Sequence, residues 1–396
     1  MANSYTFDQI ATILNAIVSD AQGRTASIAT TPRNTAQFVT MATTAIAAGT
    51  DPIMHALTSM INRTVFQFRP YTGKLRILDN SDVEYGNTIR KVTPIFHDGA
   101  EAQPMYDDQP VDGSSTDQWK IKRPQVLQTL FTGAEQWEVQ APTVFVDQLK
   151  SAFRGPDELS QFMAAQTTEV ANEIEQQREQ LARMTLANFI GAKIKKDSSN
   201  VIHLLTEYNT LCDFDTDLTD ETVYQPQNFP AFIKWVYARI EELSDKMTER
   251  SVLYHQPLTN YTILRHSPKA DQRLILYAPA MAQIKTMVMS GLYNDTLLKM
   301  APHESINFWQ NINNPDAINV TCRYLDDDGT TNTDTITKSK IFGVLYDREA
   351  MGYNILNQGV AVSPLNAKGM YYNQYHHMVK RFWNDGTQNG IVFLLD

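Results

Sequence analysis

The sequence predicts an α+β fold in which helical and strand-rich segments follow one another in several compact units. Residues from Pro156 to about Ile190 have helical character throughout, whereas short apolar runs such as Ile341 to Leu345 are typical of strands. Between about 210 and 340 helical and strand patterns alternate, which indicates a mixed α/β domain. The 396 residues suffice for two or three domains of ordinary size.

Composition limits the classes of function. Hydrophobic residues make up 42% and charged residues 20%, close to ordinary globular usage. A net charge of -10 argues against a protein whose main task is to grip phosphate backbones, since such proteins carry basic stripes. The two cysteines lie far apart and indicate no disulfide framework. No secretory signal or long apolar run is found, so we expect neither passage through a membrane nor a membrane span.

The first 60 or so residues are expected to form helices separated by open linkers. An Ala-rich helix that Gly49 stops, and a further helix that starts at Asp51-Pro52, follow a short amphipathic N-terminal helix. Such an arm buries little of itself, so we expect it to lie on a neighbouring subunit. The candidate contact residues on the first helix are Phe7, Ile10, Leu14 and Ile17.

A β-rich segment begins at Thr64 and contains a long polar excursion. Strand character occurs at Val65 to Phe68, at Leu75 to Leu78 and at Thr88 to Val92. The residues from 93 to 117 are then rich in Pro, Gly, Asp and Gln. Loops longer than about 12 to 15 residues are normally functional or disordered, so we predict a hairpin excursion that contacts an adjacent copy. Its candidate contact residues are Asp98, Glu101, Asp107, Asp108 and Asp112.

A long helix is predicted after strand-like runs at Val126 to Phe131 and Trp137 to Val146. Gly155-Pro156-Asp157-Glu158 supplies a cap, a first-turn proline and acids that suit the helix dipole, and Gly191 is the predicted stop. The apolar stripe of this helix is narrow, which leaves a coiled-coil segment as an alternative.

The second half of the chain is predicted to alternate helix and strand. The polar stretch from 197 to 227 is expected to be rich in loops and to hold a domain boundary. Asn228 is predicted to cap a helix that continues to Met247, and strands are expected at Val252 to Tyr254 and at Ala317 to Tyr324. Further strands are expected at the C-terminal end: Ile341 to Leu345, Val360 to Val362 and Ile391 to Leu395.

The sequence offers no complete catalytic or metal-binding motif, so we predict no enzyme, no cofactor and no metal site. His303-Glu304 begins like a zinc helix, but Asn307 stands where the second histidine is needed. His376-His377 would point to opposite faces of a strand and are interpreted as surface or interface residues. Asp326-Asp327-Asp328-Gly329 lacks the ligand spacing of a calcium loop and is interpreted as a hairpin turn with Gly329 at positive φ.

Aromatic and basic residues gather near the C-terminal end, and two interpretations of them are open. Stacking aromatics interleaved with cations could form a platform for nucleic acid. The acidity of the chain favours a buried or interfacial aromatic cluster instead. The residues concerned are Tyr371, Tyr372, Tyr375, Lys380, Arg381, Phe382 and Trp383.

The order of these parts resembles that of the Hong Kong 97 type of major capsid protein of tailed bacteriophages. Ile341-Phe342-Gly343-Val344-Leu345-Tyr346-Asp347-Arg348-Glu349-Ala350-Met351-Gly352 is similar to the family's strand that returns from the A-domain. Gln358 to Asn366 and Gly390 to Leu394 are similar to the strands that follow it. The resemblance covers essentially the whole chain.

The resemblance implies a domain layout with five parts. These are an N-terminal arm at 1–63, an E-loop hairpin with its base at 64–125, a P-domain at 126–209 with a spine helix at about 156–190, an A-domain at 210–340 and a return to the P-domain at 341–396. Some members of the family begin with a scaffolding segment that a protease removes. Here the arm begins at once, so we expect either a separate scaffolding protein or a mature chain.

The implied function is self-assembly into pentamers and hexamers of an icosahedral shell that encloses double-stranded DNA. The implied partners are further copies of the chain, portal and scaffolding proteins and a decoration protein, with packaged DNA nearby but not bound by sequence. The implied location is the virion capsid, after folding and assembly in the host cytoplasm. The alternative is another self-assembling phage structural protein, such as a tail tube or baseplate subunit, which would form rings or tubes. An enzyme with a non-standard site is a third hypothesis, and a deep pocket with perturbed acids or histidines would favour it.

We predict a shell without covalent cross-links. Some capsids of this type are locked by an isopeptide bond from an E-loop lysine, but no lysine lies between Thr93 and Asp117, and Lys91 and Lys120 lie at the base of the predicted hairpin. Denaturing electrophoresis of mature particles should therefore give a single band near 44.9 kDa. A ladder of multimers that survives heat and detergent would contradict this prediction.

Overall fold

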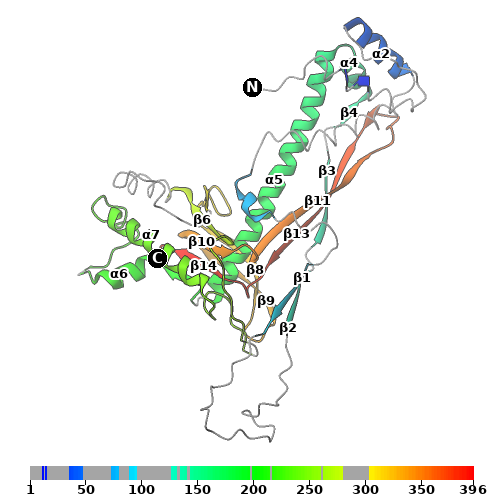
Figure 1. Cartoon of the computed structure of the whole chain (residues 1–396). Helices are drawn as coiled ribbons and strands as arrows, with labels where there is room; N and C mark the ends of the chain where they lie inside the picture. The colour runs from blue at the N-terminus through cyan, green and yellow to red at the C-terminus, as the bar shows by residue number, and fades with distance from the viewer. Residues whose placement is uncertain are drawn as a thin grey trace, which may run out of the picture. The chain divides into compact units, whose positions relative to one another are not determined.

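A computed structural model shows the chain folded into two compact units (Figure 1). It describes residues 11–12, 14–15, 35–47, 73–79, 89–95, 126–131, 134–140, 143–196, 199–214, 216–259, 262–279 and 303–396. Unit 1 comprises 1–73, 134–180 and 354–381, and unit 2 comprises 74–133, 181–353 and 382–396. Three elements, α5, β11 and β13, have residues in both units. Helices and strands occur in each unit, which confirms the α+β class.

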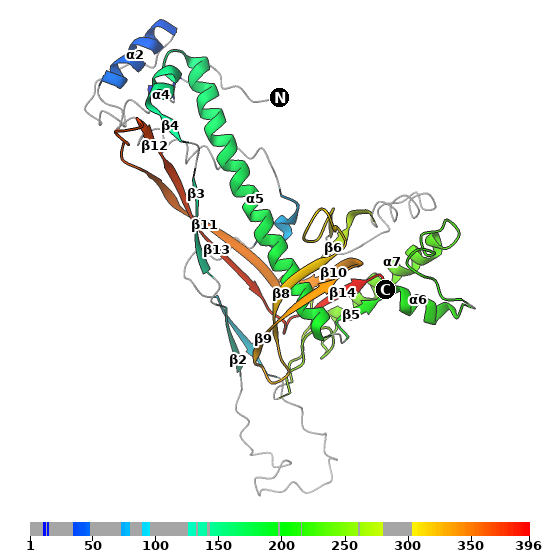
Figure 2. The same ribbon diagram turned by 180° about the vertical axis from the view of Figure 1, so that it is seen from behind.

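Unit 1 combines a three-stranded sheet of order β11-β13-β3 with helices (Figures 1 and 2). Its elements are α2 (Thr35–Ala47), β3 (Ala134–Gln140), β4 (Val144–Phe145), α4 (Val146–Ala152), the first part of α5 (Pro156–Lys196), most of β11 (Met351–Val362), β12 (Tyr371–Tyr372) and most of β13 (Gln374–Asn384). The core of the sheet is formed where Val170 and Ile174 of α5 pack with Val139 of β3 and Met378 of β13. Burial of one helix face therefore positions the long helix on the sheet.

Gly73 allows the chain to pass very close to α5 in unit 1. Its backbone N–H donates to Glu175 Oε1 at 2.9 Å, and Glu175 is buried. A Cβ atom at position 73 would lie 2.7 Å from Glu179 Oε2, so a larger residue would force that side chain to move.

Unit 2 is built around a five-stranded sheet of order β5-β14-β10-β6-β7. The strands are β5 (Val201–His203), β6 (Gln272–Tyr277), β7 (His303–Ile306), β10 (Ile341–Asp347) and β14 (Gly390–Leu394). β10 pairs antiparallel with β14 and β6, while β5 and β7 pair parallel at the two edges. Every residue of β10 and β14 is buried, as expected for central strands covered on both faces.

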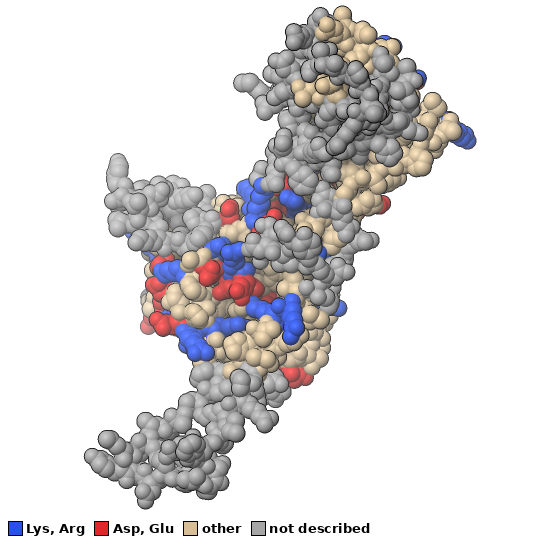
Figure 3. Space-filling view, turned by 45° about the vertical axis from the view of Figure 1, so that its right-hand side comes forward, with Lys and Arg blue, Asp and Glu red and all other residues tan. Residues whose placement is uncertain are grey.

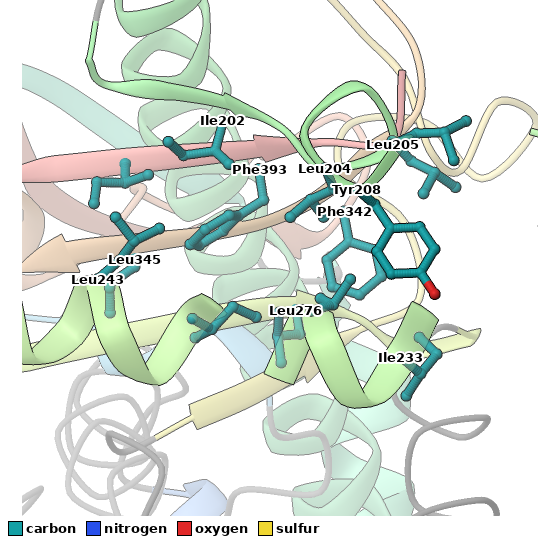
Figure 4. Close-up of a cluster of buried hydrophobic side chains, with 14 of the residues drawn as sticks. Ile202, Leu204, Leu205, Tyr208, Ile233, Leu243, Leu276, Phe342, Leu345 and Phe393 are labelled. Atoms are coloured by element: carbon teal, nitrogen blue, oxygen red, sulfur yellow. The ribbon is translucent and has the colours of Figure 1, made fainter. Parts of the chain in front are cut away.

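Helices cover both faces of this sheet. On one face α6 (Leu204–Cys212) and α7 (Phe229–Thr248) form the main core of unit 2, in which Ile233 and Leu243 of α7 face Leu276 and Leu345 of the sheet (Figure 4). On the other face Phe189 of α5 packs against Tyr346, with ring centroids 6.3 Å apart. Helix α7 and the strands β10 and β14 confirm the sequence predictions for these segments.

Gly191 does not end the long helix, which continues to Lys196. A hairpin of β8 (Ile318–Leu325) and β9 (Thr331–Lys338) lies against the helix here, and a Cβ atom at position 191 would be 3.0 Å from Val320 Cγ1. The glycine therefore serves a close helix-to-strand approach rather than a helix stop. The predicted turn of this hairpin is confirmed, because Gly329 has a φ of 88°.

Three other local predictions are wrong for identifiable reasons. Residues Lys74–Leu78 form the 3-10 helix η1 instead of a strand, with Leu75 and Leu78 buried. Residues 252–254 form no strand, because Val252 and Leu253 are exposed and Tyr254 has a φ of 68°. The prediction of loops from 197 to 227 is wrong only for 201–212, which form β5 and α6 and whose apolar residues join the main core, whereas 213–214 and 216–227 are turns and loops as predicted.

Asn228 stands at the start of α7, but its side chain does not cap the helix. Its Nδ2 donates to the carbonyl of Thr222 at 3.0 Å and so holds the preceding turn. Several predictions lie outside the described residues: the stop at Gly49, the helix from Asp51-Pro52 and the strand at Val65 to Phe68. Among the helices that the structure describes, none is both long and apolar enough to cross a membrane.

The buried His376 in unit 1 generates a pH-dependent prediction. His376 pairs with Val139 and is 1% exposed, and burial, followed by the neighbouring His377, lowers its pKa to about 4. Because an unfolded histidine titrates near pH 6.5, the unfolded chain binds the extra proton between about pH 6.5 and 4, and stability falls as the pH falls through this window.

We expect His376→Leu to remove this dependence. Between pH 7 and pH 4, the unfolding free energy of the wild type should fall by up to about 3 kcal/mol more than that of the variant. Urea unfolding of unassembled subunits at several pH values measures it. Curves that stay parallel across the window would contradict the prediction.

Candidate functional site at the base of the β1–β2 ribbon

Few of the contact residues predicted from the sequence lie in the described part of the chain. Leu14 is helical and fully buried within its own chain. The others lie outside the described residues: Phe7, Ile10, Ile17, Asp98, Glu101, Asp107, Asp108 and Asp112. The structure does describe the two strands on either side of the acidic excursion.

Strands β1 (Ile89–Pro94) and β2 (Val126–Phe131) form an antiparallel two-stranded sheet in unit 2, called the ribbon below (Figure 1). All six residues of each strand are paired, from Ile89 opposite Phe131 to Pro94 opposite Val126. The two ends of the excursion are therefore neighbours, as the predicted hairpin requires. The strand predictions at Thr88 to Val92 and at Val126 to Phe131 are confirmed.

One face of the ribbon, the inner face, is fixed to the rest of unit 2 by polar contacts. Lys91 Nζ lies 3.0 Å from Asp385 Oδ2 and 3.2 Å from Glu349 Oε2. Next on this face, Thr93 Oγ1 accepts a hydrogen bond of 3.0 Å from Arg265 Nη2. Thr93 and Asp385 are both buried, so the contacts that they make are shielded from water and salt, whereas Glu349 is exposed.

Both anchors converge on the turn between β13 and β14, residues 385–389. Arg265, which holds Thr93, also donates from Nε to the Thr387 carbonyl at 3.0 Å. Lys193 of α5 donates to the carbonyls of Gly386 and Gln388 at 3.3 and 3.2 Å. Within the turn, Thr387 donates from its backbone N–H and its hydroxyl to Asp385 Oδ1. Further bonds join Gln388 to Glu349, Asn389 to Ser267 and the Gln256 N–H to the Gly386 carbonyl.

The electrostatics of this turn follow from burial and pairing. Burial alone would raise the pKa of Asp385, but the Lys91 charge and the Thr387 hydrogen bonds outweigh it and leave this pKa below its usual value. Asp385 therefore stays ionised and paired. Burial lowers the pKa of Lys193 to about 7, although the nearby Asp385 opposes the shift.

A groove of about 660 Å³ lies beside the anchor and is lined by residues of unit 2. Its charged residues are of both signs: Arg250, Arg265 and Arg348 with Asp271, Asp347 and Glu349. Asp347 is itself bound by the Ser267 hydroxyl at 2.5 Å. The groove thus balances cations with carboxylates, and its arrangement suits positioning of the ribbon better than selection of a charged ligand.

The histidines that the sequence analysis weighed as metal ligands lie in strands. His303 begins strand β7 and not a helix. His376 is buried, which corrects its interpretation as a surface or interface residue, while His377 on the opposite face is half-buried. Among the described residues, no three His, Cys, Asp or Glu side chains are placed to hold a metal ion.

The aromatic cluster near the C-terminal end is largely packed inside its own units. Tyr372 in unit 1 is 1% exposed and Trp383 in unit 2 is 7% exposed. A Cβ atom at Gly352 would lie 2.5 Å from the Trp383 ring, so the glycine makes room for the indole. This packing favours the buried interpretation over a stacking platform for nucleic acid.

Sequence reasoning missed the 385–389 turn. Asp385-Gly386 and Asn389-Gly390 are both dipeptides that favour turns, and they stand between two apolar runs. That signal predicts a turn but not the partners of its polar groups, which come from segments remote in sequence.

Comparison with known proteins gives one family. The family model of the Phi29-like phage major capsid protein matches residues 14–394. Comparison with curated proteins finds no match.

Solved structures of phage particles have a similar fold. A chain in a structure of the head fiber and inner core protein of native bacteriophage P68 aligns with a TM-score of 0.53 and 10% identity, over 82% of this chain and 85% of that chain. The capsid structure of Staphylococcus phage Andhra aligns with a TM-score of 0.48 and 10% identity, over 83% and 86%. The capsid structure of the cyanophage P-SCSP1u aligns with a TM-score of 0.45 and 10% identity, over 83% and 89%.

The anchor of the ribbon can be tested by removing its cation. Lys91→Met leaves the Asp385 carboxylate buried without its partner, so we expect the unfolding free energy of the unassembled subunit to fall by about 3 kcal/mol. The double variant Lys91→Met/Asp385→Asn should recover most of this loss, because the uncompensated charge is gone. Urea unfolding measures both.

The matched control is Lys269→Met, which removes an exposed lysine paired with Glu241 at 2.7 Å and Asp245 at 2.6 Å. Exposed pairs contribute under about 1 kcal/mol, so this variant should be nearly neutral. Equal losses for Lys91→Met and Lys269→Met would show that the buried pair does not anchor the ribbon.

Proposed function

Because the chain belongs to the Phi29-like phage major capsid protein family, we propose that its copies assemble into pentamers and hexamers of an icosahedral shell that encloses double-stranded DNA. The single observation that carries the proposal is the family match over residues 14–394, which leaves only the ends of the chain unmatched. The protein is a structural component of the phage virion.

Membership of this family confirms the prediction of a tailed-phage major capsid protein of the Hong Kong 97 fold type. It also selects the shell over a tail tube or baseplate subunit.

The proposed layout follows the order of the parts. Residues 1–63 form the N-terminal arm, 64–125 the E-loop and its base, 126–209 the P-domain, 210–340 the A-domain and 341–396 the return to the P-domain. The 41-residue α5 supports the spine helix. Most of β11 and of β13 lie in unit 1, where they form a sheet with β3, and they support the return strands.

In this layout the ribbon joins the E-loop to the P-domain, because β1 belongs to the base of the E-loop and β2 opens the P-domain. The inner face of the ribbon is held by Lys91 and Thr93, so the two strands from which the loop departs are fixed before any neighbour is bound. A contact segment that departs from a fixed base loses less conformational entropy on binding. We propose that Asp98, Glu101, Asp107, Asp108 and Asp112 contact an adjacent copy, and that Phe7, Ile10 and Ile17 of the arm do the same.

We further propose that the chain has no enzymatic activity, assembles in the host cytoplasm and works with portal, scaffolding and decoration proteins. Packaged DNA lies near it without sequence-specific binding. The net charge of -10 supports this last point, as does the mixture of acidic and basic side chains on the described surface (Figure 3).

Electron microscopy of the purified protein tests the proposed function. Closed shells with pentameric and hexameric capsomers are the expected result. Open rings or tubes of uniform width would contradict it.

Deleting residues 2–10 tests the arm. This deletion removes Phe7 and Ile10 but keeps the buried Leu14 and α2, so we expect a folded subunit with an unchanged melting temperature. Assembly should need a protein concentration at least about tenfold higher, which corresponds to about 1.4 kcal/mol per subunit. Light scattering recorded against protein concentration measures the concentration at which assembly begins.

The matched control Asp8→Ala/Gln9→Ala changes only polar residues and should assemble normally. A deletion variant that also assembles normally would contradict the role of the arm.

A further inference from the structure

We propose that the outer face of the ribbon is a contact surface for a second copy of this chain. The outer face consists of Arg90, Val92 and Pro94 from β1 with Val126, Gln128 and Leu130 from β2, side chains that alternate with those of the anchored inner face. The inference rests on the proposed function and deepens it, since it assigns a contact to the ribbon rather than to the acidic residues of the E-loop.

The outer face is exposed, and four of its six residues are apolar. Val92 is 52% exposed, Val126 60% and Leu130 53%. The register places Pro94 opposite Val126, and Val92 lies diagonal to Val126 and Leu130. The apolar side chains therefore adjoin one another across the two strands, with Gln128 and Arg90 beside them. The inner face cannot turn outward in exchange, because Lys91 is bound to the buried Asp385 and the buried Thr93 is bound to Arg265.

The two-stranded sheet of β8 and β9 in unit 2 offers a comparison, because its exposed face is polar. The exposed positions of β9 are threonines throughout: Thr331, Thr333, Thr335 and Thr337. On β8 the exposed positions Asn319, Thr321 and Arg323 are polar as well. The ribbon departs from this rule with valine and leucine, and contiguous apolar surface on a folded protein marks an interaction site.

The size and position of the outer face select a copy of the chain as its partner. Three side chains from each of two short strands cover much less than the roughly 800 Å² per partner of a stable pairwise interface. Such a contact becomes strong when it is repeated in a closed assembly, where each copy is already held near the next. The strands also lead directly into the segment proposed to contact an adjacent copy.

The charge on the outer face is a second reason to infer that its partner is a copy of the chain. Arg90 is the one ionised side chain of the outer face, and its Nη2 donates to Gln128 Oε1 at 2.8 Å. This bond holds the guanidinium over the sheet. A copy with a net charge of -10 offers an excess of carboxylates to such a cation.

The experiment compares assembly with subunit stability. Val126→Asp and Leu130→Asp place a charge in the contact, so shell formation should need at least about tenfold more protein. The melting temperature of the unassembled subunits should stay as in wild type, because these side chains are exposed. The matched control Thr335→Asp places the same charge on the exposed face of β9 and should assemble as wild type does. Variants that assemble normally would overturn the inference.

Thiol labelling provides a readout that does not depend on the assembly yield. In a Cys212→Ser background, Leu130→Cys should react with a maleimide in free subunits and at least about tenfold more slowly in shells. Cys212 is the exposed natural cysteine, and Cys322 is buried. Slow labelling already in free subunits would mean that the chain covers this face itself, and equal labelling in shells would mean that nothing covers it. Either result overturns the inference.

The proposed function and the inference fail in different ways. A wild-type protein that forms no closed shells refutes the proposed function and the inference that rests on it. Wild-type shells together with normal assembly of Val126→Asp and Leu130→Asp refute the inference alone.

Discussion

The buried ion pair between Lys91 and Asp385 is the constraint on which the ribbon depends. Asp385 has almost no access to water, so its charge must be matched by Lys91 and by the hydrogen bonds of Thr387. The same turn binds Arg265 and Lys193, so three basic side chains from three segments meet at five consecutive residues. Most of these donors and acceptors have their hydrogen-bond or ion-pair partner in another segment. Moving one segment would therefore leave several buried polar groups without a partner, so the ribbon cannot tilt without a loss of stability.

The same arrangement explains why one ribbon has two unlike faces. Lys91 and Thr93 bind inward, while Val92, Pro94, Val126 and Leu130 are exposed on the other face, where an ordinary surface strand carries polar residues. In a monomeric protein this arrangement would be an aggregation hazard. In a protein that is surrounded by its own copies, an exposed apolar face can be covered after folding, and the polar anchor keeps it correctly presented until then.

The sequence predicted those parts of the fold whose pattern is decided locally. β10 and β14 are short apolar runs, α7 has a clear helical period, and the turn at Gly329 has its own turn residues. The errors occurred where a remote segment decides the outcome. Gly191 stays helical because β8 lies against it, and α6 forms in a polar stretch because a few apolar residues reach the main core.

The candidate site was predictable only in part, for the same reason. The position of the ribbon follows from two strand patterns, but Lys91, Arg265 and Asp385 lie far apart in the sequence, and nothing in their local context shows that they meet. From the sequence, the acidic residues of the excursion were predicted as the contact residues, because a group of charges in a polar segment is easily recognised. The exposed valines and leucine of the ribbon look like ordinary strand residues until the fold shows which face is free.

The topology of the central sheet in unit 2 has a kinetic consequence. β14 lies between β10 and β5, and β5 precedes it by nearly half the chain. Pairings of such high contact order form slowly, since a long loop must close first. The 385–389 turn immediately precedes β14, so the ribbon is not locked until this late pairing is complete. During synthesis on the ribosome, an unfinished chain thus has no fixed ribbon to offer to its neighbours, and lateral association is delayed until the subunit has folded.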